Sequence, residues 1–189
     1  EVAKGAISLK NVTIAVCVPF PYLAQAKEAL NGTNIGFGAQ NVSEQKAGAF
    51  TGEVSTSMLN DFACQYVLVG HSERRAIYGE SSALVAEKFA AALDAGLIPV
   101  LCVGETLAER EANDTMKVVG AQLKAVLDRS GVTSLTKAII AYEPVWAIGT
   151  GKTASSEQAQ EVHAAIRAQV AALDANVAKG VQILYGGSV

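Results

Sequence analysis

The sequence has little that would suit a secreted, nucleic-acid-binding or membrane-spanning protein. Its three cysteines, Cys17, Cys64 and Cys102, lie far apart, are odd in number and form no CxxC pair. This usage indicates free thiols in a reducing cytoplasm. A formal net charge of −3 argues against nucleic acid or an acidic membrane surface as the main partner. No apolar run is long enough to span a bilayer and no signal-peptide pattern is visible, so we expect a cytoplasmic protein.

Several motifs that carry chemistry in other proteins are also missing. Neither GxGxxG nor GxxxxGK[ST] occurs, so no nucleotide fingerprint is present. No GxSxG elbow occurs, and Ser72 adjoins His71 in the sequence without being placed for attack. No cluster of residues has the spacing of a metal site. We therefore expect an activity that needs no metal and no cofactor.

What the chain does have suits a single α/β domain. At 189 residues it is long enough for one well-cored domain and short for two. Half of the residues are hydrophobic, only 6% are aromatic, and small apolar residues are abundant. This composition favours close packing of helices on strands.

Six apolar runs alternate with helical patterns along the sequence. The runs predict buried strands at 12–18, 35–39, 66–69, 98–103, 137–142 and 181–185. Helices are expected at 22–30, 55–62 and 82–95, in a region that ends near Arg129, and from Ser155 or Ser156 to about Leu173. Strict alternation implies parallel strands with right-handed crossovers.

Two parallel architectures fit this order, the doubly wound sheet and the eight-fold α/β barrel. Both place ligand chemistry at the carboxyl ends of the strands. A doubly wound sheet concentrates its site at one switch point, whereas a barrel collects residues from all around. Polar or glycine residues follow strand after strand here, at His71, Gly104–Glu105, Glu143 and Gly186–Ser188. This distribution favours the barrel.

The stretch AYEPVWAIGTGK, residues 141–152, organises the predicted site. Glu143 ends a buried strand, and Pro144 stops that strand because it has no N–H to donate to the ladder. Apolar residues with a tryptophan and glycine hinges follow, in what must be a loop. We interpret the loop as a lid over the site, because closure that expels water would use that apolar surface.

His71 ends another apolar strand and begins a polar turn, GHSERR, at residues 70–75. One interpretation is a surface histidine that caps a turn. The other is a neutral imidazole, its pKa lowered by a helix N-terminus, that donates a hydrogen bond to a carbonyl. One histidine and one carboxylate without a metal favour proton transfer next to a carbonyl.

Other chemistry-bearing residues have plainer interpretations. Gly187 and its neighbours after the last strand, together with Gly149, could offer backbone N–H groups to a phosphate. Cys102 is expected to be a packed core thiol, and His163 a solvated or packing residue in a helix. The charged residues Glu73, Arg74, Arg75 and Glu80 are expected to form a solvated or structural ion-pair network.

Five motifs, in this order and spacing, resemble those of the triosephosphate isomerase family over essentially the whole chain. They are GAFTGE at 48–53, GHSERR at 70–75, LCVGE at 101–105, AYEPVWAIGTGK at 141–152 and YGGSV at 185–189. The resemblance implies a (β/α)8 TIM barrel. It also implies a glycolytic and gluconeogenic isomerase that interconverts glyceraldehyde 3-phosphate and dihydroxyacetone phosphate through an enediol or enediolate.

The resemblance also implies roles for individual residues. Glu143 would be the base, His71 the electrophile and Glu73 a carboxylate beside them. Gly149, Gly187 and Ser188 would contact the phosphate, and Tyr185 would help to latch the lid. The lid would comprise Pro144, Val145, Trp146, Ala147, Ile148, Gly149, Thr150, Gly151 and Lys152, with Glu105 assisting Trp146. The loop 40–53, with Thr51 near its tip, would be the loop that inserts into a partner in a homodimer.

The chain departs from the family in its extent. The family barrel has eight strands and about 250 residues, and we find no match here to its first strand, which carries an Asn and a Lys, or to its last strand. We interpret residues 1–189 as a single incomplete barrel domain of about six βα units. Two unpaired strand edges would then be left, so we expect these residues alone to be poorly folded and inactive.

Two alternatives remain open. One is another phosphate-binding barrel enzyme, either an isomerase or an aldolase. An aldolase would need a Schiff-base lysine at a strand end, and neither Lys137 nor Lys152 occupies such a place. A non-catalytic fragment would keep only the phosphate-binding surface or the dimer loop.

Overall fold

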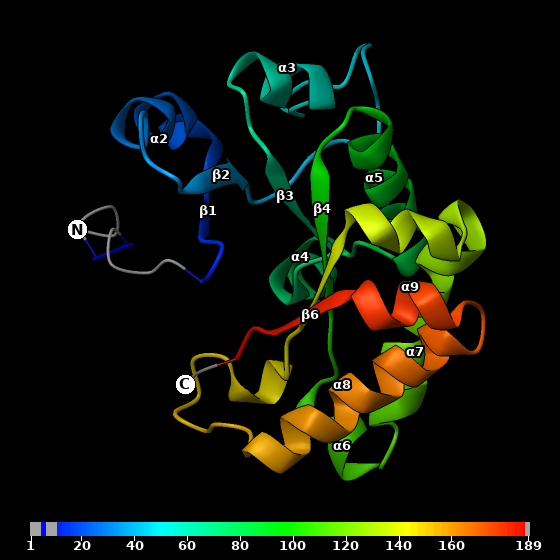
Figure 1. Cartoon of the computed structure of the whole chain (residues 1–189). Coiled ribbons are helices and arrows are strands. Elements are labelled where there is room, and N and C mark those ends of the chain that lie inside the picture. Colours follow the sequence, from blue (N-terminus) through cyan, green and yellow to red (C-terminus); the bar gives the residue numbers. More distant parts are fainter. Residues whose placement is uncertain (1–4, 7–10, 188–189) are drawn as a thin grey trace.

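The protein is a curved, parallel six-stranded sheet with helices packed along it. The computed structural model describes residues 5–6 and 11–187 (Figure 1). Its strands are β1 (Ala15–Val18), β2 (Gly36–Ala39), β3 (Tyr66–Val69), β4 (Ile98–Val103), β5 (Ile139–Tyr142) and β6 (Gln182–Tyr185). They pair in sequence order, and every pairing is parallel. This confirms the predicted arc of an α/β barrel.

Helices and short 3₁₀ turns connect the strands. The α-helices are α2 (Leu23–Ala29), α3 (Thr56–Asp61), α4 (Ser72–Tyr78), α5 (Ser82–Asp94), α6 (Leu107–Glu111), α7 (Thr115–Ser130), α8 (Ser156–Ala171) and α9 (Ala175–Gly180). The 3₁₀ turns are η1 (Phe20–Tyr22), η2 (Val132–Lys137) and η3 (Val145–Ala147). The long helices α5, α7 and α8 pack against one another in turn and lie along one side of the strands (Figure 1).

Alternation along each strand separates the two faces of the sheet. On the face covered by helices, Leu101, Ile140 and Tyr142 are fully buried in the main core. On the inner face, Val100, Cys102 and Ala141 form a second, smaller cluster. Continuing the same alternation past the strand ends sends Glu105 toward the helices and Glu143 toward the inner face. Two neighbouring acidic residues are thereby given different surroundings.

Several element boundaries differ from the sequence-based expectations. The turn expected after β3 is largely the helix α4, which His71 caps and which ends at Gly79 in the left-handed conformation. The helical region that ends near Arg129 is two helices, because Asn113 takes a positive φ of 60° between them. Helix α9 was not expected at all. Helix α8 is capped by Ser155, not Ser156.

None of the helices in the described ranges, 5–6 and 11–187, is both long and apolar enough to cross a membrane.

Candidate active site

Glu143 lies directly after β5, next to Gly104 at the end of β4. The ladder of these strands continues one residue past Tyr142, since Glu143 N–H donates to the Val103 carbonyl at 2.7 Å. A Cβ atom on Gly104 would lie 1.7 Å from the Glu143 carbonyl oxygen. Only glycine fits at this position, and the close approach fixes the Glu143 backbone at the carboxyl edge of the sheet.

His71 and Glu143, the two residues that the sequence singled out, lie side by side. Gly70 takes a positive φ of 72° at the end of β3, a conformation that glycine adopts without steric cost. The chain then turns His71 toward Glu143, with His71 Nε2 at 3.1 Å from Glu143 Oε1. The Glu143 side chain is 8% exposed and that of His71 is 26% exposed. The pair is therefore shielded from water but reachable from the inner face.

The hydrogen bonds of the His71 imidazole indicate which ring nitrogen carries the proton. Nδ1 accepts a hydrogen bond from the Glu73 N–H in the first turn of α4, which leaves the proton of the neutral ring on Nε2, facing Glu143. The expectation of a lowered pKa is wrong for this arrangement. The hydrogen bond to Glu143 raises the pKa of His71, the Glu143 and Glu73 charges add to that effect, and burial opposes it. The adjacent Glu143 carboxylate outweighs the effect of burial on the His71 pKa.

A third group, from the backbone, also contacts the Glu143 carboxylate. The Ser72 backbone N–H, at the start of α4, donates to Glu143 Oε2 at 3.2 Å. Both oxygens of the carboxylate are therefore occupied. The sequence alone does not indicate this contact, because the donor is not the Ser72 hydroxyl but the backbone N–H that a helix beginning at Ser72 leaves free.

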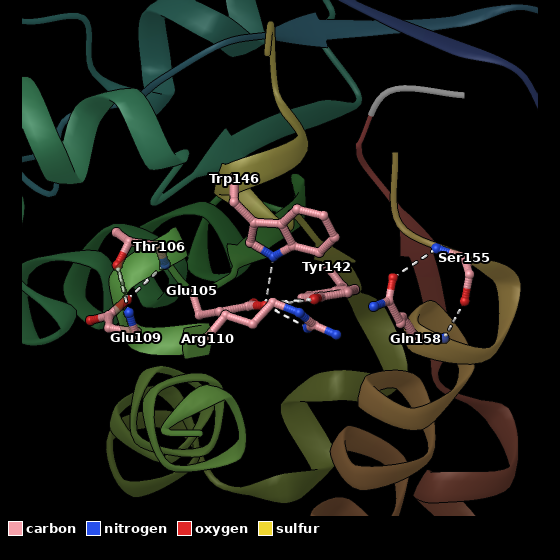
Figure 2. A network of polar contacts seen from close by, with 8 residues as sticks. All are labelled: Glu105, Thr106, Glu109, Arg110, Tyr142, Trp146, Ser155 and Gln158. Atoms are coloured by element: carbon pink, nitrogen blue, oxygen red, sulfur yellow. Dashed lines mark hydrogen bonds and ion pairs between the residues drawn. The ribbon is translucent and has the colours of Figure 1, made fainter. Parts of the chain in front are cut away.

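Glu105 holds the beginning of the predicted lid. Its buried carboxylate accepts hydrogen bonds from the Tyr142 hydroxyl, from Arg110 at 3.0 Å and from the Trp146 indole N–H at 2.9 Å (Figure 2). The Arg110 guanidinium also lies 4.8 Å from the centre of the Trp146 ring. Trp146 is thus half-buried on a hydrogen-bonded support, in the turn η3 that opens the lid. After η3, Ile148 is half-buried and residues 149–152 are exposed. Gly149 and Gly151 both have positive φ.

The glycines predicted to face a phosphate fall in two places. Gly186 follows β6 beside the carboxylate, where an added Cβ atom would lie 3.2 Å from Glu143 Cγ. Gly187 comes next and Gly149 lies at the exposed tip of the lid. Ser188 lies outside the described residues. The structure thus places the β6 glycines at the same sheet edge as Glu143.

The other residues singled out by the sequence have varied positions. Glu73 is mostly exposed, with its carboxylate 3.7 Å from His71 Nδ1. Thr51 is exposed in the loop 40–53. Cys102 is buried in the inner cluster as expected, and burial raises the pKa of its thiol well above the ordinary value. His163 packs edge-on against the Tyr142 ring.

The expected charge cluster is structural, and most of it is shielded from solvent. Glu80 is buried and accepts from Arg74 and from the equally buried Lys88, which also donates to Asn41. Arg75 donates to the carbonyls of Gly70 and Cys102. The described residues contain no group of three His, Cys, Asp or Glu side chains that could hold a metal ion.

The fold and the paired groups define a class of protein, a parallel α/β barrel with a carboxylate and an imidazole at the carboxyl ends of neighbouring strands. The family model described as triosephosphate isomerase matches residues 1–189, the whole sequence. The chain belongs to the triosephosphate isomerase family.

Curated relatives named triosephosphate isomerase are similar along nearly all of this chain. That of Thiobacillus denitrificans is 65% identical over 182 residues, which are 96% of this chain and 73% of the relative. That of Dechloromonas aromatica is 61% identical over 189 residues, 100% of this chain and 76% of the relative. That of Cupriavidus necator is 63% identical over 179 residues, 95% of this chain and 73% of the relative.

Proposed function

We propose that the protein interconverts glyceraldehyde 3-phosphate and dihydroxyacetone phosphate by proton transfer, as a cytoplasmic enzyme of glycolysis and gluconeogenesis. The observation that carries the proposal is the 3.1 Å approach of His71 Nε2 to Glu143 Oε1 at the carboxyl edge of the sheet. A base and a hydrogen-bond donor so placed can act on a carbon–hydrogen bond and on the adjacent carbonyl. Free cysteines at positions 17, 64 and 102 fit a reducing compartment.

The two groups divide the work of the reaction. Glu143 takes the proton from the carbon next to the carbonyl, and the electron pair of that bond forms the enediolate. His71 donates its Nε2–H to the oxygen on which negative charge develops. Once that oxygen has taken the Nε2 proton, the imidazole regains a proton from the hydroxyl on the adjacent carbon. The oxygen of that hydroxyl becomes the new carbonyl as Glu143 returns its proton to the carbon that carried the first carbonyl. Because His71 and Ser72 occupy the Glu143 oxygens, the substrate carbonyl must replace Glu143 as the acceptor of the His71 proton before the base can act.

The lid and the glycines serve the same chemistry. The segment 144–152 closes over the enediolate and keeps out water, which would otherwise promote loss of phosphate. Gly149, Gly187 and Ser188 bind the phosphate through backbone or hydroxyl groups, and Glu73 adjusts the charge around His71. Figure 2 gives the support for this lid, with Trp146 held on Glu105.

The test uses a completed barrel, made by joining residues 1–189 to the parts of the Thiobacillus denitrificans relative that this chain does not match. Glu143→Gln should lower kcat by about 10²–10⁴-fold while leaving the affinity for a phosphate-bearing inhibitor largely intact. His71→Gln should also lower kcat strongly, without a matching rise in KM. Glu87→Gln, a change in an exposed ion pair with Arg129, is the control and should leave kcat unchanged. Turnover retained in Glu143→Gln would exclude the base assignment.

We further propose that the complete enzyme is a homodimer built through the loop 40–53 and α4. Phe50 in that loop is 45% exposed, and Ile77 and Tyr78 on α4 are 70% and 68% exposed. Large apolar side chains grouped on a loop and a helix are typical of surfaces that a partner covers. Since α4 begins beside His71, a partner loop seated there would also support the site.

A polypeptide limited to residues 1–189 is proposed to lack turnover. Within the described residues β1 and β6 each pair on one side only, so both edges of this arc are open to solvent or to other chains. The assay is the isomerase rate of this polypeptide measured beside that of the completed barrel. Equal rates would reject the proposed inactivity.

A further inference from the structure

The end of β4 carries a backbone group that the sheet does not satisfy. β3 ends at Val69, which lies opposite Leu101, so the described strands offer no partner for Gly104 on that side. A buried or half-buried peptide group without a partner is costly. In this structure the partner is a side chain from α7, because Gln122 Oε1 accepts from Gly104 N–H at 2.8 Å and Gln122 Nε2 donates to the Gly104 carbonyl at 3.0 Å.

This two-point contact resembles one rung of a sheet ladder. The planar amide of Gln122 holds two consecutive peptide groups, the one that carries the Gly104 N–H and the one that carries the Gly104 carbonyl. It therefore fixes the backbone at Gly104 more fully than one hydrogen bond could. Gly104 is the residue that touches the Glu143 backbone on one side and precedes Glu105 in the chain. These two hydrogen bonds from Gln122, the Gln122 clamp, therefore lie between Glu143 at the site and Glu105, which supports the lid.

Two further contacts connect the clamp to the lid. The Glu105 carbonyl accepts from the Val145 N–H at 3.1 Å, and the Glu105 carboxylate accepts from the Trp146 indole N–H at 2.9 Å. The carbonyl and the carboxylate of Glu105 thus both hold the turn in which the lid begins. Figure 2 shows the contact of the carboxylate with Trp146. A rotation of the Gly104 peptide would move both of these acceptors together.

We propose that Gln122 is a positioning residue: by clamping the Gly104 peptide it fixes Glu105, and through Glu105 it sets the resting position of the lid at Trp146. The inference rests on the proposed function only in treating residues 144–152 as the lid of an isomerase. Gln122 touches none of the reacting groups. Its effect passes entirely through the backbone of 104–105.

The experiment measures Trp146 directly and needs no turnover. Trp146 is the only tryptophan in residues 1–189, and the sample is the ¹⁵N-labelled completed barrel. The indole N–H signal that disappears in Trp146→Phe belongs to the proton bonded to Glu105. Gln122→Met keeps the length of the side chain and removes both hydrogen bonds. We expect indole exchange with solvent to become about fivefold faster, the factor that corresponds to losing one net hydrogen bond.

Gln169→Met is the matched control. Gln169 is also half-buried and donates to a backbone carbonyl, that of Gly120 at 3.0 Å, but it joins α8 to α7 away from Gly104. The indole exchange of Gln169→Met should stay within about twofold of the wild-type rate, because Gln169 anchors α7 near Gln122 but does not bond the backbone at Gly104. An unchanged rate in Gln122→Met, or an equal increase in both variants, would overturn the proposal.

A second variant and a separate activity assay keep the test of Gln122 decisive. If Gln122→Met does not fold, Gln122→Glu keeps the shape and the acceptor for Gly104 N–H but cannot donate when ionised, and the same faster exchange is expected from it. If the completed barrel proves to have no isomerase activity, the proposed function fails, whereas the exchange measurement still decides the role of Gln122.

Discussion

At the scale of single residues, two acidic side chains just beyond neighbouring strands, Glu105 two residues after β4 and Glu143 one residue after β5, have different surroundings. Glu105 points toward the helices and is fully buried, with donors from Arg110, Tyr142 and Trp146. Glu143 points to the inner face, where His71 and the Ser72 N–H contact its two carboxylate oxygens. The alternation of the strands explains the difference. The Glu105 carboxylate is held by several side-chain donors, whereas the donors to the Glu143 carboxylate are ones that a ligand could replace.

The first prediction concerns the pKa of His71. Glu143→Gln removes the hydrogen bond and the charge that raise this pKa and leaves burial, which lowers it. The pKa should therefore fall from above 6.5 to about that value or below it. An NMR titration of the two histidines measures this, with His163, whose pKa is lowered by burial, as the internal reference.

The same measurement has a control and a consequence for stability. Glu73→Gln should lower the His71 pKa less, because the Glu73 charge is the smallest of its causes. Since the folded-state pKa is raised, the pair stabilises the fold fully below pH 6.5 and loses this contribution as the pH rises through the raised value. A His71 pKa unchanged in Glu143→Gln would mean that the two groups do not interact in solution.

At the scale of elements, two helices that follow the site begin with capping boxes. The Thr106 hydroxyl accepts from Glu109 N–H while the Glu109 carboxylate accepts from Thr106 N–H, and Ser155 and Gln158 repeat the pattern at α8 (Figure 2). Each box satisfies N–H groups that a helix N-terminus leaves free. The second box follows the lid directly, so it also fixes the point at which the lid ends.

The second prediction tests that cap. Ser155→Ala removes the hydroxyl that accepts from Gln158 N–H and should lower the free energy of unfolding by about 1 kcal/mol. Urea unfolding measures the change. Ser156→Ala, one residue further along, is the control and should change stability by less than about 0.5 kcal/mol. The reverse order of effects would place the start of α8 one residue later.

At the scale of the whole molecule, the sequence predicted the parts that depend on local pattern. All six strands, their order along the chain and the meeting of His71 with Glu143 follow from apolar runs that end in polar residues. Two helices were not predicted. Helix α4 (Ser72–Tyr78) is largely polar and charged in its first turns, and only three residues separate α9 from the end of α8, so neither stands out as a separate apolar pattern. The Gln122 clamp joins residues 18 apart, and only the packing of α7 on β4 brings them together.

The third prediction concerns the buried network that joins α4 and α5 to the loop after β2. Burial tends to raise the pKa of Glu80, but hydrogen bonds and charge from Lys88 and Arg74 outweigh it, so the pKa is lowered. Its stabilising contribution is therefore present above pH 4.5 and lost as the pH falls through the lowered value. Lys88→Met should cost about 3 kcal/mol at pH 7, because it removes one partner of a buried ion pair.

Urea unfolding at pH 7 and at lower pH checks both parts of this prediction. Wild type should lose the Glu80 contribution on acidification, whereas Lys88→Met should lose less, since little of that contribution is left. Lys124→Met, in an exposed pair with Asp128, is the control and should cost less than about 1 kcal/mol. Equal losses in the two variants would contradict a structural role for the buried network.

The fourth prediction concerns assembly, and it separates the proposed interface from other apolar surface. In the completed barrel, Ile77→Asp should convert the dimer to a monomer, because a carboxylate would be buried at the interface without a partner. Analytical ultracentrifugation measures the mass. Leu173→Asp is the control: Leu173 is 61% exposed, close to the 70% of Ile77, but lies beyond α8, so that variant should remain dimeric. A dimer that persists in Ile77→Asp would place the contact on a surface other than α4, and the partner loop could not then support His71.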